Sequence, residues 1–502
     1  MLFLNFNAKL EVIFFYNQFY LGEDDMEKQT INVLLISSHR LPGLKSSRGS
    51  LPVSLLNLAS ALRKSGHRPV ILDLSIVKIP DSSNPEEYCL SKIDEAIKKN
   101  NPGLIGLSCF TTMHFPLVSK LARAIRAKEP GVPICMGGVH PTLFSEKILE
   151  NCPEVDFIAV GEGEEQIVIL ADAIASGHLE KIKDVQGLGY RCDDRQKFVV
   201  NPRQTFTTAL DDLPGPAYDM VNFSHYYDDH SNWHNPKQKE IRLSVPIYTT
   251  RSCPFNCSFC SVPLVMGRAL RRRTPEKVAD EIEMLVRDYG QNYFSLSDDN
   301  VNVDKKHFMA VCHAIVQRKL DLQLCIAQGL YLSMVDEDIV RAFVEAGGIT
   351  VSVPIESGNN FLRTKIIGKH LTDEKIYEIV RLLQKYDLFT IGFFIMGFPE
   401  DTVDTLNDML VMIAKLKLDV SSVNTLIPFP GTRIYQQAVK ERLFLFDEAK
   451  VWNGEIFFDP LNKRDFFIQP YNLSLEELRR FRERFNEVYF TSKRAQILNV
   501  RP

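Results

Sequence analysis

Three cysteines within residues 251–260 have the types and spacing best suited to chemistry. The segment reads Arg-Ser-Cys-Pro-Phe-Asn-Cys-Ser-Phe-Cys and places Cys253, Cys257 and Cys260 in a Cys-x3-Cys-x2-Cys arrangement. Thiolates are the usual protein ligands of iron–sulfur clusters, and three on one loop can hold three irons of a cubane. The fourth iron then lacks a protein ligand and is open to a small molecule.

A structural zinc loop is the alternative for the same cysteines. Zinc prefers four ligands and commonly uses paired Cys-x2-Cys knuckles, and the sequence contains no second knuckle. A non-catalytic metal-binding module of this kind would bind zinc and catalyse no reaction. The spacing therefore favours the cluster.

With the aromatic Phe259 directly before the last cysteine, the motif resembles the radical S-adenosylmethionine (SAM) superfamily. The resemblance implies a [4Fe–4S] cluster bound by Cys253, Cys257 and Cys260, with no catalytic residue beyond these ligands. It also implies that the open iron chelates SAM. Reductive cleavage of SAM then gives a 5′-deoxyadenosyl radical, which takes hydrogen from an unactivated carbon.

Further matches to the superfamily lie at the ends of predicted strands. The implied SAM contacts are Phe259, Asp298, Asp299, Glu356, Ser357, Ile395 and Gly397. The Asp298-Asp299 pair departs from the common Gly-Gly-Glu, and Phe393 replaces the first glycine of the Gly-x-Ile-x-Gly-x-x-Glu pattern. Residues 428–432 (Pro-Phe-Pro-Gly-Thr) resemble the sixth-strand loop of the cobalamin branch.

Two glycine-rich loops in the first half resemble the cobalamin-binding domain that precedes many radical SAM enzymes. They read Gly-Gly-x-His-Pro-Thr at residues 137–142 and Gly-Glu-Gly-Glu at residues 161–164. Glycines let the backbone approach a large ligand closely. The implied cobalamin contacts are Gly137, Gly138, His140, Thr142, Gly161, Glu162 and Gly163.

The loop after the first predicted strand departs from the form that ligates cobalt from below, Asp-x-His-x-x-Gly. His39 has neither the aspartate two residues before it nor the glycine three residues after it. The resemblance therefore implies cobalamin without a lower histidine ligand. A vestigial domain that binds no cobalamin is the alternative.

The elements that position these residues follow from hydrophobic patterning. In the first half, strands are predicted at residues 31–36, 70–74, 104–108, 132–136 and 157–160, and helices at 52–65, 91–99, 115–128 and 164–176. Apolar strands alternating with helices predict a parallel sheet covered on both faces, with ligands outside the carboxyl ends of the strands.

The second half continues the alternation. Strands are predicted at residues 247–250, 293–296, 324–327, 350–355, 389–396 and 420–427, and helices from 274 to 290 and at 336–346, 374–386 and 474–489. This β/α repeat predicts a partial or full barrel with its site at the carboxyl ends of the strands. Arg271-Arg272-Arg273 could bind an anion, but we expect this run to be solvated charge.

The fold class is thus α/β, in five parts. We expect an N-terminal extension (1–29), a Rossmann-like doubly wound cobalamin-binding domain (30–180), a linker (181–245), a radical SAM (β/α) partial barrel (246–440) and a small α-rich C-terminal region (441–502). The aromatic start lacks the basic residues and cleavage site of a signal peptide. It is either an accessory segment or an upstream extension before Met26, with weak membrane-surface contact as the alternative.

Composition limits the partners. The 502 residues are 45% hydrophobic and 24% charged with a net charge of −4, which is globular and gives no general basis for nucleic-acid binding. No segment predicts a transmembrane helix, and we expect a cytoplasmic location. The seven other cysteines are expected to be small buried core residues.

These resemblances cover most of the chain and imply a cobalamin-dependent radical SAM enzyme of the class B methyltransferase and anaerobic cyclase-like branch. Its cofactors would be the [4Fe–4S] cluster, SAM and cobalamin. Methyl transfer to an unactivated carbon is the leading hypothesis, and cyclisation or oxidation of a lipid or tetrapyrrole-type molecule is the alternative. We expect a small-molecule substrate, with the aromatic termini hinting at an apolar one, and an electron donor such as flavodoxin or ferredoxin.

Overall fold

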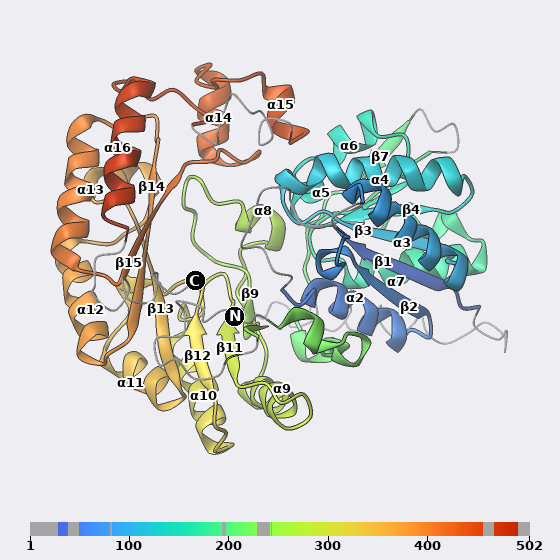
Figure 1. Ribbon diagram of the computed structural model, residues 1–502, viewed down its shortest axis with the longest axis horizontal. Helices are drawn as coiled ribbons and strands as arrows, with labels where there is room; N and C mark the ends of the chain where they lie inside the picture. Colours follow the sequence, from blue (N-terminus) through green and yellow to red (C-terminus); the bar gives the residue numbers. More distant parts are fainter. Residues whose placement is uncertain are drawn as a thin grey trace, which may run out of the picture.

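The computed structural model describes residues 29–38, 50–80, 83–192, 197–227, 241, 243–454 and 466–489. The predicted N-terminal extension, up to residue 28, and His39 lie outside the described residues. Two α/β units stand side by side in Figure 1, with the first half of the chain in blue and cyan and the second in yellow and orange.

The first unit is built on a seven-stranded sheet with the strand order β2-β1-β3-β4-β5-β6-β7. Its strands are β1 (Asn32–Ser37), β2 (Arg68–Asp73), β3 (Leu104–Ser108), β4 (Ile134–Gly137), β5 (Phe157–Ala159), β6 (Leu188–Arg191) and β7 (Phe198–Val200). Strands β1 to β5 are parallel, which confirms the doubly wound prediction. Strands β6 and β7 are antiparallel additions. The segment 181–245 is therefore not merely a linker, because its first part extends the sheet.

Helices cover both faces of this sheet. They are α2 (Val53–Lys64), α3 (Pro85–Asn100), α4 (Phe115–Lys128), α5 (Val139–Leu143), α6 (Ser145–Asn151) and α7 (Glu164–Ser176). Val33 and Leu35 of β1 pack with the α2 and α7 side, and Leu34 and Ile36 pack with the α3 and α4 side. The strand is apolar at every position because both of its faces are buried.

The order of the strands fixes where a ligand can enter. The chain places β2 on one side of β1 and β3 on the other, so the connections after β1 and β3 leave in opposite directions. Ligands of open α/β sheets bind in the crevice outside the carboxyl ends of the strands at such a switch point.

The second unit has six parallel strands in the order β15-β14-β13-β12-β11-β8. Its strands are β8 (Val245–Ile247), β11 (Tyr293–Leu296), β12 (Gln323–Ile326), β13 (Gly348–Glu356), β14 (Phe389–Met396) and β15 (Val420–Thr425). Among the described strands β8 and β15 are the two edges, so the barrel is partial. A short hairpin, β9 (Thr250–Arg251) with β10 (Arg271–Arg272), flanks it.

Helices alternate with these strands around the outside of the barrel (Figure 1). They are α9 (Pro275–Arg287), α10 (Lys305–Gln317), α11 (Glu337–Glu345), α12 (Asp373–Lys385) and α13 (Val403–Leu416). The short helix α8 (Val262–Met266) lies instead between the two units, where it contacts α5 of the first unit (Figure 1). The long ones bury one apolar face against the sheet, as in α9, where Val278, Ile282 and Leu285 join the core. Throughout the described part of the chain, no helix combines the length and apolarity needed to cross a membrane.

The C-terminal region contacts both units. It contains α15 (Glu448–Trp452) and α16 (Leu475–Glu487), and α14 (Arg433–Lys440) comes directly before it, at the end of the predicted barrel segment. Phe481 and Phe485 of α16 join the core of the barrel. Trp452 of α15 instead packs on the first unit, with its ring centroid 5.6 Å from that of Phe115. The two units are therefore joined at α15 as well as through the connecting segment.

Candidate active site

Cys253, Cys257 and Cys260 lie on the loop between β9 and α8, beyond the carboxyl end of β8. All three are half-buried free thiols. The Cys260 N–H donates to the Cys257 carbonyl at 3.1 Å, so the last turn of the loop is closed on itself. Of the seven other cysteines, six are buried and Cys192 is half-buried, in keeping with core residues.

Contacts from several elements hold this loop. Ser252, immediately before the first cysteine, has a left-handed φ of 80°, and its Oγ donates to the Gly267 carbonyl at 2.6 Å. The Ser258 N–H donates to the Ile367 carbonyl at 2.8 Å. Asn300 Nδ2 lies 3.9 Å from Cys253 Sγ. A non-glycine residue held in the left-handed region marks a backbone that its surroundings have fixed.

The donor set fits a cubane cluster better than a single ion. Among the described residues, no three His, Cys, Asp or Glu side chains gather closely enough to surround one metal ion. A cubane requires a wider arrangement, because each thiolate binds a different iron. Burial raises the pKa of Cys257 to about 11, and the positive charge of Lys369 acts in the opposite direction. A cation therefore already lies near the loop.

A cavity of about 290 Å³ opens beside the cysteine loop at the carboxyl ends of β13, β14 and β15. Three of the predicted SAM contacts line it, namely Phe259, Glu356 and Ile395. The rest of the lining is Phe393, Phe394, Asn424, Thr425, Leu426, Ile427 and Phe429. The wall is thus mostly apolar, with a single carboxylate. Phe393, which stands where the motif has a glycine, is part of this wall.

Glu356 occupies an unusual backbone position. Its φ is 70°, and the register between β13 and β14 shifts between Pro354 and Glu356. Such a bulge redirects a side chain. Lys369 Nζ donates to Glu356 Oε1 at 3.0 Å and to the Pro354 carbonyl at 2.5 Å. No motif pointed to Lys369, since a single lysine after a glycine carries no distinctive pattern.

Neither of the two aspartates predicted to contact SAM, Asp298 and Asp299, lines the small cavity. Asp298 is fully buried, and its Oδ1 accepts hydrogen bonds from the backbone and hydroxyl groups of Thr249 and Thr250. Burial raises the pKa of Asp298 to about 6 despite these bonds. Asp299 is exposed and lines a larger cavity. Asp298 therefore anchors the turn that leads into the cysteine loop.

Ser357 and Gly397 also lie outside the lining of the small cavity. The Ser357 carbonyl accepts from Arg363 Nη1 at 2.7 Å. Gly397 has a φ of 95°, and its N–H donates to Asp401 Oδ2 at 2.7 Å, as the N–H of Phe398 does at 2.9 Å. Asp401 was missed at the sequence level because the superfamily pattern directs attention to its neighbour, Glu400. These residues support the strand ends around the cavity.

A second cavity, of about 820 Å³, is lined by both units. Five of the predicted cobalamin contacts lie in its wall, namely Gly137, Gly138, Gly161, Glu162 and Gly163. The second unit contributes Tyr248, Thr250, Arg251 and Asp299 among others. Residues 210–216, which we expected only to connect the domains, form another part of the wall. The cavity thus reaches from the switch point of the first sheet to the residues just before the cysteine loop.

His140 and Thr142 are not among the lining residues. The His140 ring is buried between Phe115 and Phe144, at centroid distances of 4.4 and 4.8 Å. Burial lowers the pKa of His140 to about 3, which keeps its ring neutral. Thr142 Oγ1 donates to the Gly138 carbonyl and accepts from the Gly161 N–H, both at 2.8 Å. This placement favours roles in ordering the glycine loops.

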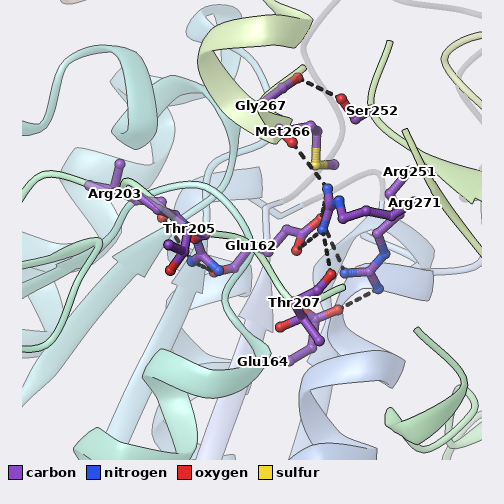
Figure 2. A network of polar contacts seen from close by, with 11 residues as sticks. Glu162, Glu164, Arg203, Thr205, Thr207, Arg251, Ser252, Met266, Gly267 and Arg271 are labelled. Carbon is purple, nitrogen blue, oxygen red and sulfur yellow. Dashed lines mark hydrogen bonds and ion pairs between the residues drawn. The ribbon is translucent and has the colours of Figure 1, made fainter. Parts of the chain in front are cut away.

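Charged residues of the two units pair at the edge of the large cavity (Figure 2). Arg271 Nη1 and Nη2 each lie 2.7 Å from an oxygen of Glu162, and Arg251 Nη2 lies 2.7 Å from Glu164 Oε1. The prediction of solvated charge is therefore wrong for Arg271, which is buried. It is also wrong for Arg273, which pairs with Glu281 at 2.5 Å. Arg272 is exposed and its Nε lies 2.8 Å from Asp304 Oδ2, so the three arginines have three different partners.

Comparison with known families matches two parts of the chain. Residues 247–413 match the radical SAM superfamily, and residues 49–171 match the B12 binding domain. An uncharacterized methyltransferase of Pyrococcus horikoshii is 28% identical over 83% of this chain and 84% of its own length. The anaerobic magnesium-protoporphyrin IX monomethyl ester cyclase of Rubrivivax gelatinosus is also 28% identical, over 82% of this chain and 70% of its own. Relatives of both kinds thus span most of the chain.

Solved structures resemble the same two-unit arrangement. The radical SAM methyltransferase TsrM of Kitasatospora setae, with cobalamin and a [4Fe–4S] cluster bound, aligns at a TM-score of 0.66 and 20% identity, over 83% of this chain and 75% of TsrM. The cobalamin-dependent S-adenosylmethionine radical enzyme OxsB, with aqua-cobalamin bound, aligns at a TM-score of 0.63 and 18% identity, over 82% of this chain and 56% of OxsB. At these identities the likeness is one of fold.

We predict that Gly138→Ala lowers the melting temperature. Gly138 has a φ of 118°, and an added Cβ would lie 2.5 Å from the Cys109 carbonyl oxygen. Left-handed backbone costs roughly 1–2 kcal/mol in an L-residue and the clash adds to it, so calorimetry should show a fall of roughly 3–8 °C. Gly131→Ala is the matched control, because nothing lies within 4 Å of its added Cβ. An unchanged melting temperature for Gly138→Ala would contradict this.

Asp401→Asn should change how stability depends on pH. Burial raises the pKa of Asp401 to about 6, outweighing the N–H groups of Gly397 and Phe398 that favour the carboxylate. A carboxyl pKa above the unfolded value means that stability is lost as pH rises from about 4 through about 6. Asparagine mimics the protonated form. The difference between the melting temperatures of the variant and of wild type should therefore increase in favour of the variant as the pH rises from about 4.5 to about 7.5. The exposed Asp404→Asn controls for loss of charge, and a gain that does not change with pH would argue against the prediction.

Proposed function

Because this chain is a radical SAM enzyme that also carries a B12-binding domain, we propose that it transfers a methyl group to an unactivated carbon of a small molecule. The observation that carries the proposal is the pair of cavities. One adjoins the cysteine loop, and the other extends from the glycine loops of the first unit to Arg251, just before that loop. A radical source and a methyl donor can thus act near one substrate.

The cofactors of this class are a [4Fe–4S] cluster, SAM and cobalamin. We assign the cluster to Cys253, Cys257 and Cys260, whose loop is held from several sides. When bound, the cluster and SAM supply the 5′-deoxyadenosyl radical, and cobalamin supplies the methyl group. We further propose a small electron donor such as flavodoxin or ferredoxin, since reductive cleavage requires an electron.

The small cavity is the proposed SAM site. Phe259 and Ile395 form part of its apolar wall, which excludes water from a reactive radical. Glu356 and its partner Lys369 offer an anionic acceptor and a cationic donor, which suit hydroxyl and carboxylate groups. We assign supporting roles to Asp298, Ser357 and Gly397, because each shapes a strand end without lining the cavity.

The large cavity is the proposed cobalamin site. The backbones of Gly137, Gly138, Gly161 and Gly163 line it, and backbone without side chains can lie against a broad, flat ligand. Thr142 holds the two glycine loops together. On the other side, Asp299 with Tyr248 faces the same space, where polar groups can orient a substrate.

Ring formation or oxidation is the second candidate. The observation that favours it is the similarity to an anaerobic magnesium-protoporphyrin IX monomethyl ester cyclase, which covers 82% of the chain, against 83% for the Pyrococcus methyltransferase. Both candidates share the radical step and differ in whether a methyl group is consumed. A tetrapyrrole- or lipid-type substrate is part of this second proposal.

Product analysis should separate the candidates. We predict that protein purified without oxygen, reconstituted with iron and sulfide, and given a reductant, hydroxocobalamin and SAM forms both 5′-deoxyadenosine and S-adenosylhomocysteine. Both products, measured by liquid chromatography and mass spectrometry, are expected for methyl transfer. Cys253→Ala should abolish 5′-deoxyadenosine, whereas Cys192→Ala, a matched half-buried thiol outside the loop, should not.

Other outcomes have distinct meanings. 5′-Deoxyadenosine without S-adenosylhomocysteine would favour cyclisation or oxidation over methyl transfer. Neither product, under conditions in which a known relative is active, would contradict the radical assignment of the three cysteines.

A further inference from the structure

The loop after β5 serves two structures at once. The backbones of Gly161 and Gly163 line the large cavity, while the carboxylates of Glu162 and Glu164 reach the second unit. A group bound against this backbone therefore also restricts the positions of the two carboxylates.

Those carboxylates hold the chain immediately before the cysteine loop. Arg251 pairs with Glu164 at 2.7 Å and with Glu162 at 3.4 Å. Arg251 precedes Ser252, whose left-handed backbone leads directly into Cys253. Only one residue thus separates an arginine fixed by the first unit from a proposed cluster ligand.

The hairpin couples Arg251 to Arg271. The two residues are directly paired across β9 and β10, and Arg271 is bidentate to Glu162. Arg271 also donates to the Met266 carbonyl at 3.0 Å, which lies beside the Gly267 carbonyl that accepts from Ser252 (Figure 2). Both strands of the hairpin are therefore tied to the same loop of the first unit.

The junction is closely filled. The guanidinium carbons of Arg203 and Arg271 lie 4.9 and 5.1 Å from the centroid of the Phe206 ring. A Cβ added at Gly267 would lie 2.7 Å from the same ring. On the side that faces Phe206 the side chains are packed without space, so a displacement of Arg271 there is passed on to its neighbours.

The charges are buried enough to be sensitive to their partners. The side chains of Glu162 and Arg271 are each 4% exposed, and that of Glu164 is 12% exposed. Burial raises the pKa of Glu164, but the nearby Arg251 outweighs it and keeps that pKa below its usual range. A buried charge that loses its partner is strongly unfavourable, so these pairs hold one geometry.

We propose that Arg251 is a positioning residue that makes cobalamin and the iron–sulfur cluster bind interdependently. The inference rests on the proposed function, because it requires both cofactors to bind. Cobalamin against Gly161 and Gly163 fixes Glu162 and Glu164, these fix Arg251, and Arg251 fixes the start of the cysteine loop. Linkage requires the converse, that a bound cluster tightens cobalamin binding by the same factor.

The test compares hydroxocobalamin affinity in full-length protein with and without the reconstituted cluster, by equilibrium dialysis in the absence of oxygen. For wild type we expect the cluster to tighten binding at least about fivefold. For Arg251→Met the ratio should fall close to one. Glu164→Gln, which keeps the side-chain shape, should also lower this ratio. Arg251→Lys, which keeps the positive charge, should have a ratio between those of wild type and Arg251→Met.

Arg63→Met is the matched control. Arg63 pairs with Asp219 at 2.9 Å, but this pair is exposed and does not line the cavity. The variant should keep the wild-type ratio. Circular dichroism shows whether each variant is folded. The fraction of iron that a chelator has removed at equilibrium, with and without hydroxocobalamin, measures the reverse coupling.

The outcomes distinguish the two proposals. A wild-type ratio of one, or a ratio preserved in folded Arg251→Met and Glu164→Gln, would overturn the coupling while leaving cobalamin binding intact. No hydroxocobalamin binding by wild type in either form would instead overturn the proposed function on which the coupling rests.

Discussion

The arrangement of the molecule depends on a buried carboxylate that must be neutralised. Glu162 is enclosed where the two units meet, and a carboxylate there is tolerable only beside a fixed positive charge. Arg271 provides that charge from the second unit. The pair holds the loop after β5 of the first unit against the hairpin of the second, at a cavity that residues beyond the strand ends of both sheets line.

Local patterns predicted the elements well, because they depend on residues close in sequence. The strands Leu104–Ser108, Tyr293–Leu296 and Phe389–Met396 and the helix Phe115–Lys128 have the predicted bounds, since each is a clear apolar or amphipathic run. The antiparallel pair β6 and β7 escaped notice, because its strands are short and follow the last predicted helix of an otherwise parallel pattern.

The site was predictable only as far as its motifs. The cysteines and Glu356 could be predicted because each lies in a recognisable sequence motif. The roles of Arg271 and Lys369 could not, because they depend on partners that only the fold brings close. Arg271 stands 109 residues from Glu162, so an arginine run read alone suggests only solvated charge. Asp298 illustrates another limit. The motif predicts that Asp298 follows a strand, but the direction of the Asp298 side chain depends on hydrogen bonds from two threonines that follow the neighbouring strand.

The path of the chain across the junction also bears on how the protein is made. The first unit is complete before Thr250 and Asp299, which form the far wall of the large cavity, leave the ribosome. Trp452, which ties the C-terminal region back to Phe115, is made later still. Domains generally fold in the order of synthesis. The nascent first unit therefore leaves its glycine loops uncovered while the barrel is being translated, and the large cavity is enclosed only late in the synthesis of the chain.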